Sequence, residues 1–176
     1  MSAWRADLAA CDRRGTVGQA IIAWFANPGF VLACHYRLAH WAAGRGTLGR
    51  VIAVLVERRM LREFACQISA GAVIGPGLRL PHPLGVVVGR GVVIGSGATL
   101  YHGVTLGRRS AGEELYPRLG DGVVVYCGAT LVGGVDLSDG TRIGVGEIVI
   151  SEPQGLMRDM VVVGERRASG GRVPRR

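Results

Sequence analysis

Two histidines, His82 and His102, are the side chains of this sequence best suited to acid-base chemistry. A neutral imidazole can accept the proton of a hydroxyl group near pH 7, so an exposed histidine beside a groove is a candidate general base. His82 stands two residues after Leu80, and His102 stands two residues after Leu100. Whether the two rings lie together therefore depends on the elements that carry these two leucines.

Both leucines belong to a six-residue repeat between residues 68 and 150. Its aliphatic positions are Ile68, Ile74, Leu80, Val88, Ile94, Leu100, Leu106, Leu119, Val125, Leu131, Leu137, Ile143 and Val149. A short strand followed by a tight turn cannot bury its own aliphatic side chain, so successive units must coil and stack, three units to a coil. The repeat predicts a parallel β-helix whose neighbouring coils lie about 4.8 Å apart.

Two insertions interrupt the period. One falls between Leu80 and Val88, and the longer one spans Arg108–Arg118. Insertions in a solenoid become surface loops, and we expect the longer, polar one to project. With the first insertion removed, Leu80 and Leu100 are three units apart, which is one full coil.

The same column therefore carries His82 and His102 on adjacent coils, and through the second insertion it reaches Cys127. The residues alone leave three interpretations open. The histidines are surface residues without a role, or ligands of a zinc ion together with Cys127. In the third interpretation one of them is a general base beside a groove between coils or subunits, with backbone amides of the turns holding an oxyanion.

Residues 1–65 lack the repeat and are expected to form helices over 4–12, 17–26, 30–43 and 48–64. We expect this module to cover the end of the β-helix, because terminal coils need a cap. His35 and His40 are five residues apart, which does not place them on one helical face, so packing or capping roles are expected. The predicted organisation is a helical module (1–65), a β-helix domain (66–155) and a basic tail (156–176).

Composition argues against a membrane protein or a secreted one. The mean hydropathy is +0.29, but the Val, Ile and Leu excess falls largely in the repeat. The apolar run Ala20–Cys34 is divided by Asn27-Pro28-Gly29 into pieces too short to span a bilayer, and no signal peptide is recognisable. The four cysteines have no CxxC spacing, which is typical of reduced thiols, so we expect a cytoplasmic protein without a membrane partner.

All 21 basic residues are arginine, and the net charge is +8. The absence of lysine excludes lysine nucleophiles and Schiff bases. Six arginines fall in the last nineteen residues, which favours a solvated tail, or alternatively contacts to the phosphates of a nucleotide-like cofactor. No nucleic-acid-binding motif accompanies them, so no nucleic acid partner is expected.

The repeat region resembles the hexapeptide-repeat acyltransferases, and most closely the serine O-acetyltransferases. The matching strings are Leu80–Gly89 (LPHPLGVVVG), Thr99–Gly107 (TLYHGVTLG), Tyr116–Asp121 (YPRLGD) and, in the helical module, Tyr36–Trp41 (YRLAHW). The resemblance implies a left-handed β-helix and a homotrimer in which acetyl-CoA, the acyl donor, lies in a groove between adjacent subunits. It also implies that His82 activates the acceptor hydroxyl.

Further site residues follow from that resemblance and from their positions. His102 and Tyr116 are expected to shape the acceptor pocket, and Arg108 and Arg109 to bind a carboxylate. Small residues at turns on successive coils are expected to admit the pantetheine arm of the donor: Gly107, Gly128, Ala129, Gly144 and Gly146. No metal is expected.

Three departures from the family concern the acceptor. Pro81 stands where the family has an aspartate, Tyr116 replaces the histidine of an Arg-His-Pro string, and Gln67 replaces the aspartate that partners it. These changes leave the residue that would activate the hydroxyl, but they remove the side chains with which the family binds a charged amino acid. We expect an acceptor that is serine or another small hydroxyl compound; the alternatives are a sugar acceptor and a non-catalytic trimeric scaffold.

Overall fold

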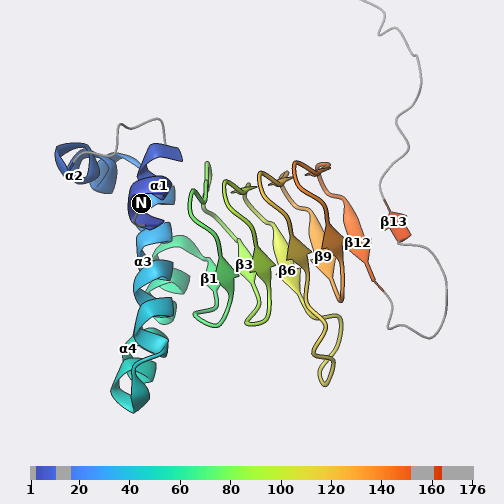
Figure 1. The fold of residues 1–176 in the computed structure, drawn as a ribbon, viewed down its shortest axis with the longest axis horizontal. Coiled ribbons are helices and arrows are strands. Elements are labelled where there is room, and N and C mark those ends of the chain that lie inside the picture. Colours follow the sequence, from blue (N-terminus) through green and yellow to red (C-terminus); the bar gives the residue numbers. More distant parts are fainter. Residues whose placement is uncertain (1–2, 11–16, 152–160, 164–176) are drawn as a thin grey trace, which may run out of the picture.

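The chain begins with helices and continues as a coil of short strands (Figure 1). The computed structural model describes residues 3–10, 17–151 and 161–163. The helices are α1 (Ala3–Ala10), α2 (Val17–Ala26), α3 (Pro28–Ala43) and α4 (Gly46–Phe64). Their ends lie within two residues of those predicted. Asn27 sets the start of α3, because its side chain accepts a hydrogen bond of 3.0 Å from the Phe30 amide and Pro28 fills the first turn.

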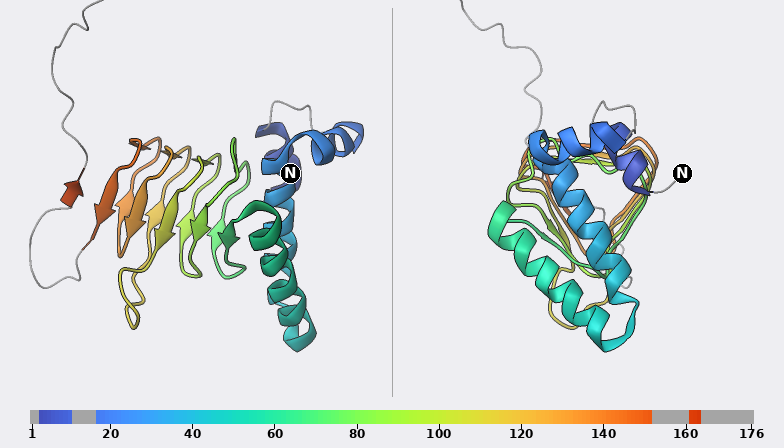
Figure 2. Two further views of the ribbon diagram at one scale, coloured as in Figure 1. Left: turned by 180° about the vertical axis from the view of Figure 1, so that it is seen from behind. Right: turned by 90° about the vertical axis from the view of Figure 1, so that its left-hand side faces the viewer.

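The coil has three sides. The first sheet contains β1 (Gln67–Ile68), β3 (Val87–Val88), β6 (Thr105–Gly107), β9 (Thr130–Val132), β12 (Ile148–Ile150) and β13 (Val161–Val163). The second contains β2 (Val73–Ile74), β4 (Val93–Ile94), β7 (Arg118–Leu119) and β10 (Asp136–Leu137), and the third β5 (Thr99–Leu100), β8 (Val124–Val125) and β11 (Arg142–Ile143). The triangular outline is visible along the coil axis (Figure 2).

Pairing between coils is parallel and joins equivalent repeat positions. In the first sheet Ile68 pairs with Val88, Val88 with Leu106, and Leu106 with Leu131. All thirteen aliphatic repeat positions are buried, with at most 6% of their surface exposed. Full burial of such a side chain contributes about 1.5–3 kcal/mol, so this column supplies much of the stability of the fold. The prediction of a three-sided parallel β-helix is confirmed.

The helical module closes one end of this coil. Helices α3 and α4 lie across the triangular opening beside β1 (Figure 2). Leu32, Tyr36 and Met60 are fully buried and join the aliphatic core. The Tyr36 hydroxyl donates to the Ala72 carbonyl at 2.8 Å, and burial raises the pKa of this side chain. The predicted cap is confirmed, and it extends the core by one further layer.

A buried ion pair fastens α1 to α3 and to the first coil. Asp7 is 1% exposed, and its carboxylate accepts hydrogen bonds from Arg37 Nε at 3.0 Å and Arg37 Nη2 at 3.1 Å. The same carboxylate accepts from the backbone amides of Gly77 at 2.8 Å and Leu78 at 2.9 Å. Arg37 also donates to the carbonyl of Gly75 at 2.7 Å. One carboxylate thus holds together three segments that are far apart in the sequence.

The two histidines of the helical module have structural roles, as predicted. His35 Nδ1 lies 2.8 Å from the Val31 carbonyl, and its ring stacks on Trp24. His40 Nδ1 lies 2.9 Å from the Ala70 carbonyl at the first turn of the coil. Both rings therefore serve packing between elements.

The longer insertion leaves the coil between β6 and β7 and projects away from it (Figure 1). This confirms the expectation for residues 108–118. The predicted basic tail lies outside the described residues except for β13, which pairs antiparallel with β12. In the part of the chain that the structure describes, no helix has the length and apolar character needed to cross a bilayer.

Candidate active site

His82 and His102 lie side by side at the edge where the third side of the coil turns into the first. Both side chains are exposed, and their ring centroids are 6.2 Å apart with an interplanar angle of 67°. The adjacency predicted from the repeat is confirmed. A hydroxyl compound can approach either imidazole from solvent at this edge, which we call the histidine edge (the turns at residues 81–86, 101–104, 126–129 and 144–147).

Cys127 continues the same column one coil further. The Gly128 amide donates to the His102 carbonyl at 2.9 Å, which sets the two turns in register. Among residues 3–10, 17–151 and 161–163, however, no three His, Cys, Asp or Glu side chains are grouped so that they could hold a metal ion. The zinc interpretation of this column therefore has no ligand set among these described residues.

A ridge of glycines runs along the histidine edge. Gly85, Gly103, Gly128 and Gly146 all have positive φ, between 66° and 72°, and stack from coil to coil. A Cβ added to Gly103 would lie 3.5 Å from the Gly128 Cα, so the ridge is flat backbone. Such a surface can accept an extended, unbranched ligand along the coil axis.

Of the five residues predicted to contact the donor, some lie on the glycine ridge and others do not. Gly128 and Gly146 lie on the ridge, whereas Gly107 ends β6 on the other edge of the first sheet. The amide of Gly144 is engaged by Glu147 Oε2 at 2.6 Å. The Ala129 side chain is fully buried in the core. The Ala129 amide donates to the Tyr126 carbonyl at 3.3 Å and the Ala129 carbonyl accepts from the Thr105 amide at 2.9 Å, so the polar backbone groups of this residue are engaged within the coil.

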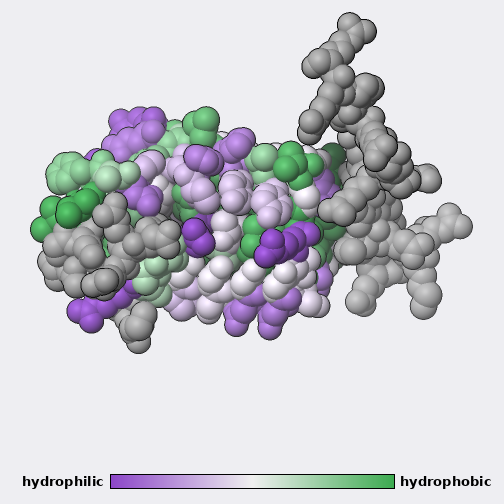
Figure 3. All heavy atoms as spheres, turned by 90° about the horizontal axis from the view of Figure 1, so that it is seen from above, coloured by the Kyte–Doolittle hydropathy of each residue, from purple (hydrophilic) through white to green (hydrophobic). Residues whose placement is uncertain are grey.

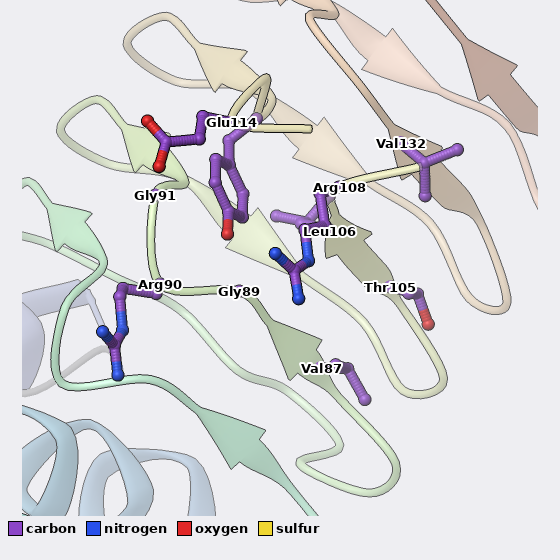
Figure 4. A pocket seen from close by; sticks show the side chains of 11 residues that line it. Val87, Gly89, Arg90, Gly91, Thr105, Leu106, Arg108, Glu114 and Val132 are labelled. Carbon is purple, nitrogen blue, oxygen red and sulfur yellow. The ribbon is translucent and has the colours of Figure 1, made fainter. Parts of the chain in front are cut away.

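A cavity of about 860 Å³ lies at that other edge, where the projecting loop returns to the coil (Figure 4). Its apolar wall is made by Val87, Leu106 and Val132 on the first sheet. Its polar groups are Arg90, Arg108, Glu114, Tyr116 and Thr105. Cavities of this volume are typical of ligands larger than a single amino acid.

Tyr116 and Arg108, both predicted to contact the acceptor, line this cavity together. Arg109 does not line it and instead lies 3.9 Å from Glu113 within the loop. The half-buried Tyr116 ring lies directly over the turn of Gly89 and Gly91, where a side chain would overlap it. The loop therefore reaches back over the preceding coil.

Arg90 was missed in the sequence, although a signal was present. It stands two residues after Val88, as Arg108 stands two residues after Leu106, so the repeat places the two arginines on adjacent coils. The histidine pair was identified in the same way, because His82 and His102 each follow a buried repeat leucine by two residues. Glu114 had no such signal, because its position depends on the path of the loop.

Gly91→Ala is expected to push the Tyr116 ring out of place and to lower stability by about 1–3 kcal/mol, because the new methyl group would occupy the space of the ring. The midpoint of urea unfolding measures this effect. Gly134→Ala is the matched control: it occupies the same repeat position two coils further, where a Cβ meets Leu115 at an ordinary 3.7 Å. Equal effects of the two substitutions would contradict the placement of Tyr116.

Within one chain, the histidine edge and the cavity stand apart. His102 precedes β6 and Arg108 follows it, and six residues of extended chain span on the order of 20 Å. The structure thus brings together His82 with His102, and separately Arg108 with Tyr116. The two pairs lie on opposite edges of the same sheet.

Known proteins resemble this chain in sequence and in structure, although no family model matches it. The serine acetyltransferase of Mycobacterium tuberculosis is 34% identical over 152 residues, which cover 85% of this chain and 66% of that protein. The serine acetyltransferase of Escherichia coli K12 is 32% identical over 123 residues, covering 69% of this chain and 44% of the enzyme. A structure of soybean serine acetyltransferase complexed with serine is similar with a TM-score of 0.65 and 31% identity, over 86% of this chain and 67% of that one.

These likenesses confirm the predicted fold class, a left-handed parallel β-helix with a small N-terminal helical module. This chain spans under half the length of the Escherichia coli protein and about two thirds of the soybean one.

Proposed function

We propose that this chain, which belongs to the serine O-acetyltransferase-like family of hexapeptide-repeat acyltransferases, is an acetyl-CoA-dependent O-acetyltransferase. Its acceptor is serine or another small hydroxyl compound. The observation that carries the proposal is the exposed pair of His82 and His102 on a glycine ridge, in a chain 34% identical to a serine acetyltransferase.

In the proposed reaction His82 is the general base. Its imidazole accepts the proton of the acceptor hydroxyl as that oxygen attacks the thioester carbonyl carbon, a contribution typically worth 10²–10⁴-fold in rate. The C–O bond forms, the carbonyl oxygen becomes an oxyanion, and backbone amides of the turns stabilise it. The C–S bond then breaks, and the coenzyme A thiolate takes up the proton from the imidazolium. The exposure of His82 supports this role, because the acceptor must reach the ring.

His102 assists by position. Its ring lies beside the His82 ring, with centroids 6.2 Å apart and an interplanar angle of 67°, close to edge-on. We assign His102 to orienting the acceptor and the base. The acceptor side of the site is assigned to the projecting loop. Its residues are Arg108 and Tyr116, which line the cavity, and Arg109, which lies beside Glu113 within the loop.

The separation of the two pairs supports a homotrimer. In one chain His82 and the Arg108–Tyr116 cavity lie on opposite edges of the first sheet, so a single chain does not complete the site. A cyclic assembly places one edge of each subunit against the other edge of its neighbour. The donor groove then lies between subunits, with the pantetheine arm along the glycine ridge past Gly128 and Gly146.

The acceptor side differs from the family pattern in charge. Pro81, Tyr116 and Gln67 occupy positions where the family carries ionisable residues, while Arg90 and Arg108 line a cavity of about 860 Å³. An acceptor carboxylate can bind these arginines. The volume favours a second candidate, transfer to a sugar hydroxyl. The soybean relative was solved with serine, so serine is the first acceptor to test.

Release of the coenzyme A thiol from acetyl-CoA tests the proposal across a panel of serine, homoserine and sugars. We expect release that depends on one class of acceptor. Calorimetry with coenzyme A separates an enzyme from a scaffold, because a non-catalytic scaffold binds no donor. Absence of both binding and thiol release would overturn the proposed function. We place the enzyme in the cytoplasm, where the thiols of Cys66 and Cys127 stay reduced.

A further inference from the structure

The outer surface of the helical module carries an unusual number of exposed apolar side chains beside arginines. We define the cap face as the part of α3, α4 and the turn between them that points away from the coil. Its apolar members are Leu38, Trp41, Leu48, Val51 and Leu55, and its basic members are Arg45, Arg58 and Arg62.

Helix α4 presents two opposite faces. Gly49, Ala53 and Met60 are buried, and at about 100° per residue they form one stripe. The opposite stripe follows the spacing i, i+3, i+7, i+10, i+14 and consists of Leu48, Val51, Leu55, Arg58 and Arg62. All five are exposed, and Leu48 exposes 74% of its surface. The apolar half of the stripe is therefore outside the core.

Helix α3 continues this surface. Leu32 and Tyr36 face the coil, while Leu38 and Trp41 are exposed on the other side. The Arg45 guanidinium lies 3.5 Å from the centroid of the Trp41 ring, a cation–π contact. Because both helices lie across the end of the coil, their outer stripes share one end of the molecule (Figure 2).

Hydrophobic residues gather at the helical end of the molecule, which is at the left in Figure 3. Helix α2 contributes Ile21, Ile22, Trp24 and Phe25, the last with 85% of its surface exposed. Scattered apolar residues are normal on a protein surface, whereas apolar side chains that share one exposed helix face, as on the cap face, mark an interaction site.

The charge of the module decides what kind of partner fits. Residues 17–64 contain six arginines and only two acidic residues, Glu57 and Glu63. Glu57 accepts a hydrogen bond from the Ala70 amide, and Glu63 pairs with Arg59 at 2.9 Å. Both carboxylates are therefore engaged. The exposed apolar side chains are therefore surrounded by net positive charge. Such a surface is electrostatically complementary to an anionic partner.

We propose that the cap face binds the anionic surface of a membrane, with α3 and α4 lying in the plane of the lipid head groups. Apolar stripes bordered by arginine, with tryptophan at the rim, are typical of helices that lie at such an interface. A second copy seated on this face by two-fold symmetry would bring the same basic surface against itself. This inference goes beyond the proposed acyl transfer and does not depend on it. It replaces the expectation, drawn from composition, that the chain has no membrane partner.

Flotation of the full chain with lipid vesicles tests the inference. We expect the chain to float with phosphatidylcholine vesicles containing about 30% phosphatidylglycerol and to remain unbound with phosphatidylcholine alone. Raising the salt concentration from 0.1 M to 0.5 M is expected to reduce binding, because ions screen surface charges. A chain that fails to float with anionic vesicles at 0.1 M salt overturns the proposal.

Substitutions identify the surface. The double variant Leu48→Ser, Leu55→Ser is expected to weaken vesicle binding at least about tenfold, since two exposed apolar side chains lose their contact with lipid. Arg58→Gln with Arg62→Gln is expected to weaken binding to the anionic vesicles and to make the remaining binding less sensitive to salt. The matched controls lie on the last coil: Val145→Ser, which is 72% exposed, and Arg142→Gln should leave binding unchanged.

Two outcomes contradict the assignment to lipid. Equal binding by the Leu48→Ser, Leu55→Ser variant and the Val145→Ser control would show that another surface meets the vesicle. If instead the leucine variant halves the mass of a larger assembly in light scattering, and neither protein floats, the cap face binds a second copy. Circular dichroism confirms that each variant is folded, which is expected because every substituted side chain is exposed.

Discussion

His82→Ala is expected to lower turnover by at least about a hundredfold while the midpoint of unfolding stays unchanged. The loss follows from removal of the proposed base, since positioned proton acceptors contribute 10²–10⁴-fold. Stability is preserved because the ring is exposed at a turn and no core contact is lost. Thiol release from acetyl-CoA under saturating acceptor gives the turnover, and urea unfolding gives the midpoint.

The pattern of kinetic constants separates a base from a binding residue. A missing base lowers kcat and kcat/KM together, whereas a missing binding contact raises KM. Affinity for coenzyme A, measured by calorimetry, is expected to be unaltered. His102→Ala is the matched comparison on the adjacent coil, and we expect a smaller loss of turnover from it. Retained turnover in His82→Ala would refute the assignment of the base.

Asp7→Ala is expected to destabilise the protein by about 3–5 kcal/mol, the usual consequence of breaking one side of a buried ion pair. The Arg37 guanidinium would lose its counter-ion, and the amides of Gly77 and Leu78 would lose their acceptor. For a chain of this length the thermal midpoint should fall by about 10 °C. Differential scanning calorimetry measures the change.

Asp136→Ala provides the control, because this carboxylate is exposed on β10 of the coil. It should leave the thermal midpoint within about 2 °C of the parent chain. Asp7→Asn keeps an oxygen that can accept from the two amides but removes the charge opposite Arg37, so an intermediate loss is expected. If Asp7→Ala melts like Asp136→Ala, the attachment of α1 to the coil does not contribute to stability.

The β-helix could be predicted from the sequence because a six-residue period of aliphatic residues is satisfied by a coil of short strands. Short strands with inward aliphatic residues must coil, and the arithmetic of insertions then fixes which positions are neighbours. This is why the meeting of His82 and His102 was predictable from residues 20 apart. The helix ends were predictable for local reasons, such as the Asn27-Pro28 start of α3.

The contacts that the coil makes with the projecting loop and with the helices could not be predicted, because no local sequence pattern indicates them. Tyr116 lies over Gly91 because the projecting loop folds back across the preceding coil, and no periodicity describes that path. Asp7 meets Gly77 across 70 residues of sequence. In α4, Leu48, Val51 and Leu55 share the outer face with arginines, while the Glu57 carboxylate turns inward and accepts a hydrogen bond from the Ala70 amide.

The two ends of the coil are protected in different ways. Helices cover the rim beside β1, and β13 pairs antiparallel with β12 at the far rim, with Ile148 opposite Val163. An uncovered rim would offer unpaired amides and carbonyls to another molecule, and head-to-tail addition of that kind has no natural stopping point. Helices across one end and an antiparallel strand on one of the three sides at the other end oppose such addition, so we expect this protein at high concentration to form discrete particles and not filaments.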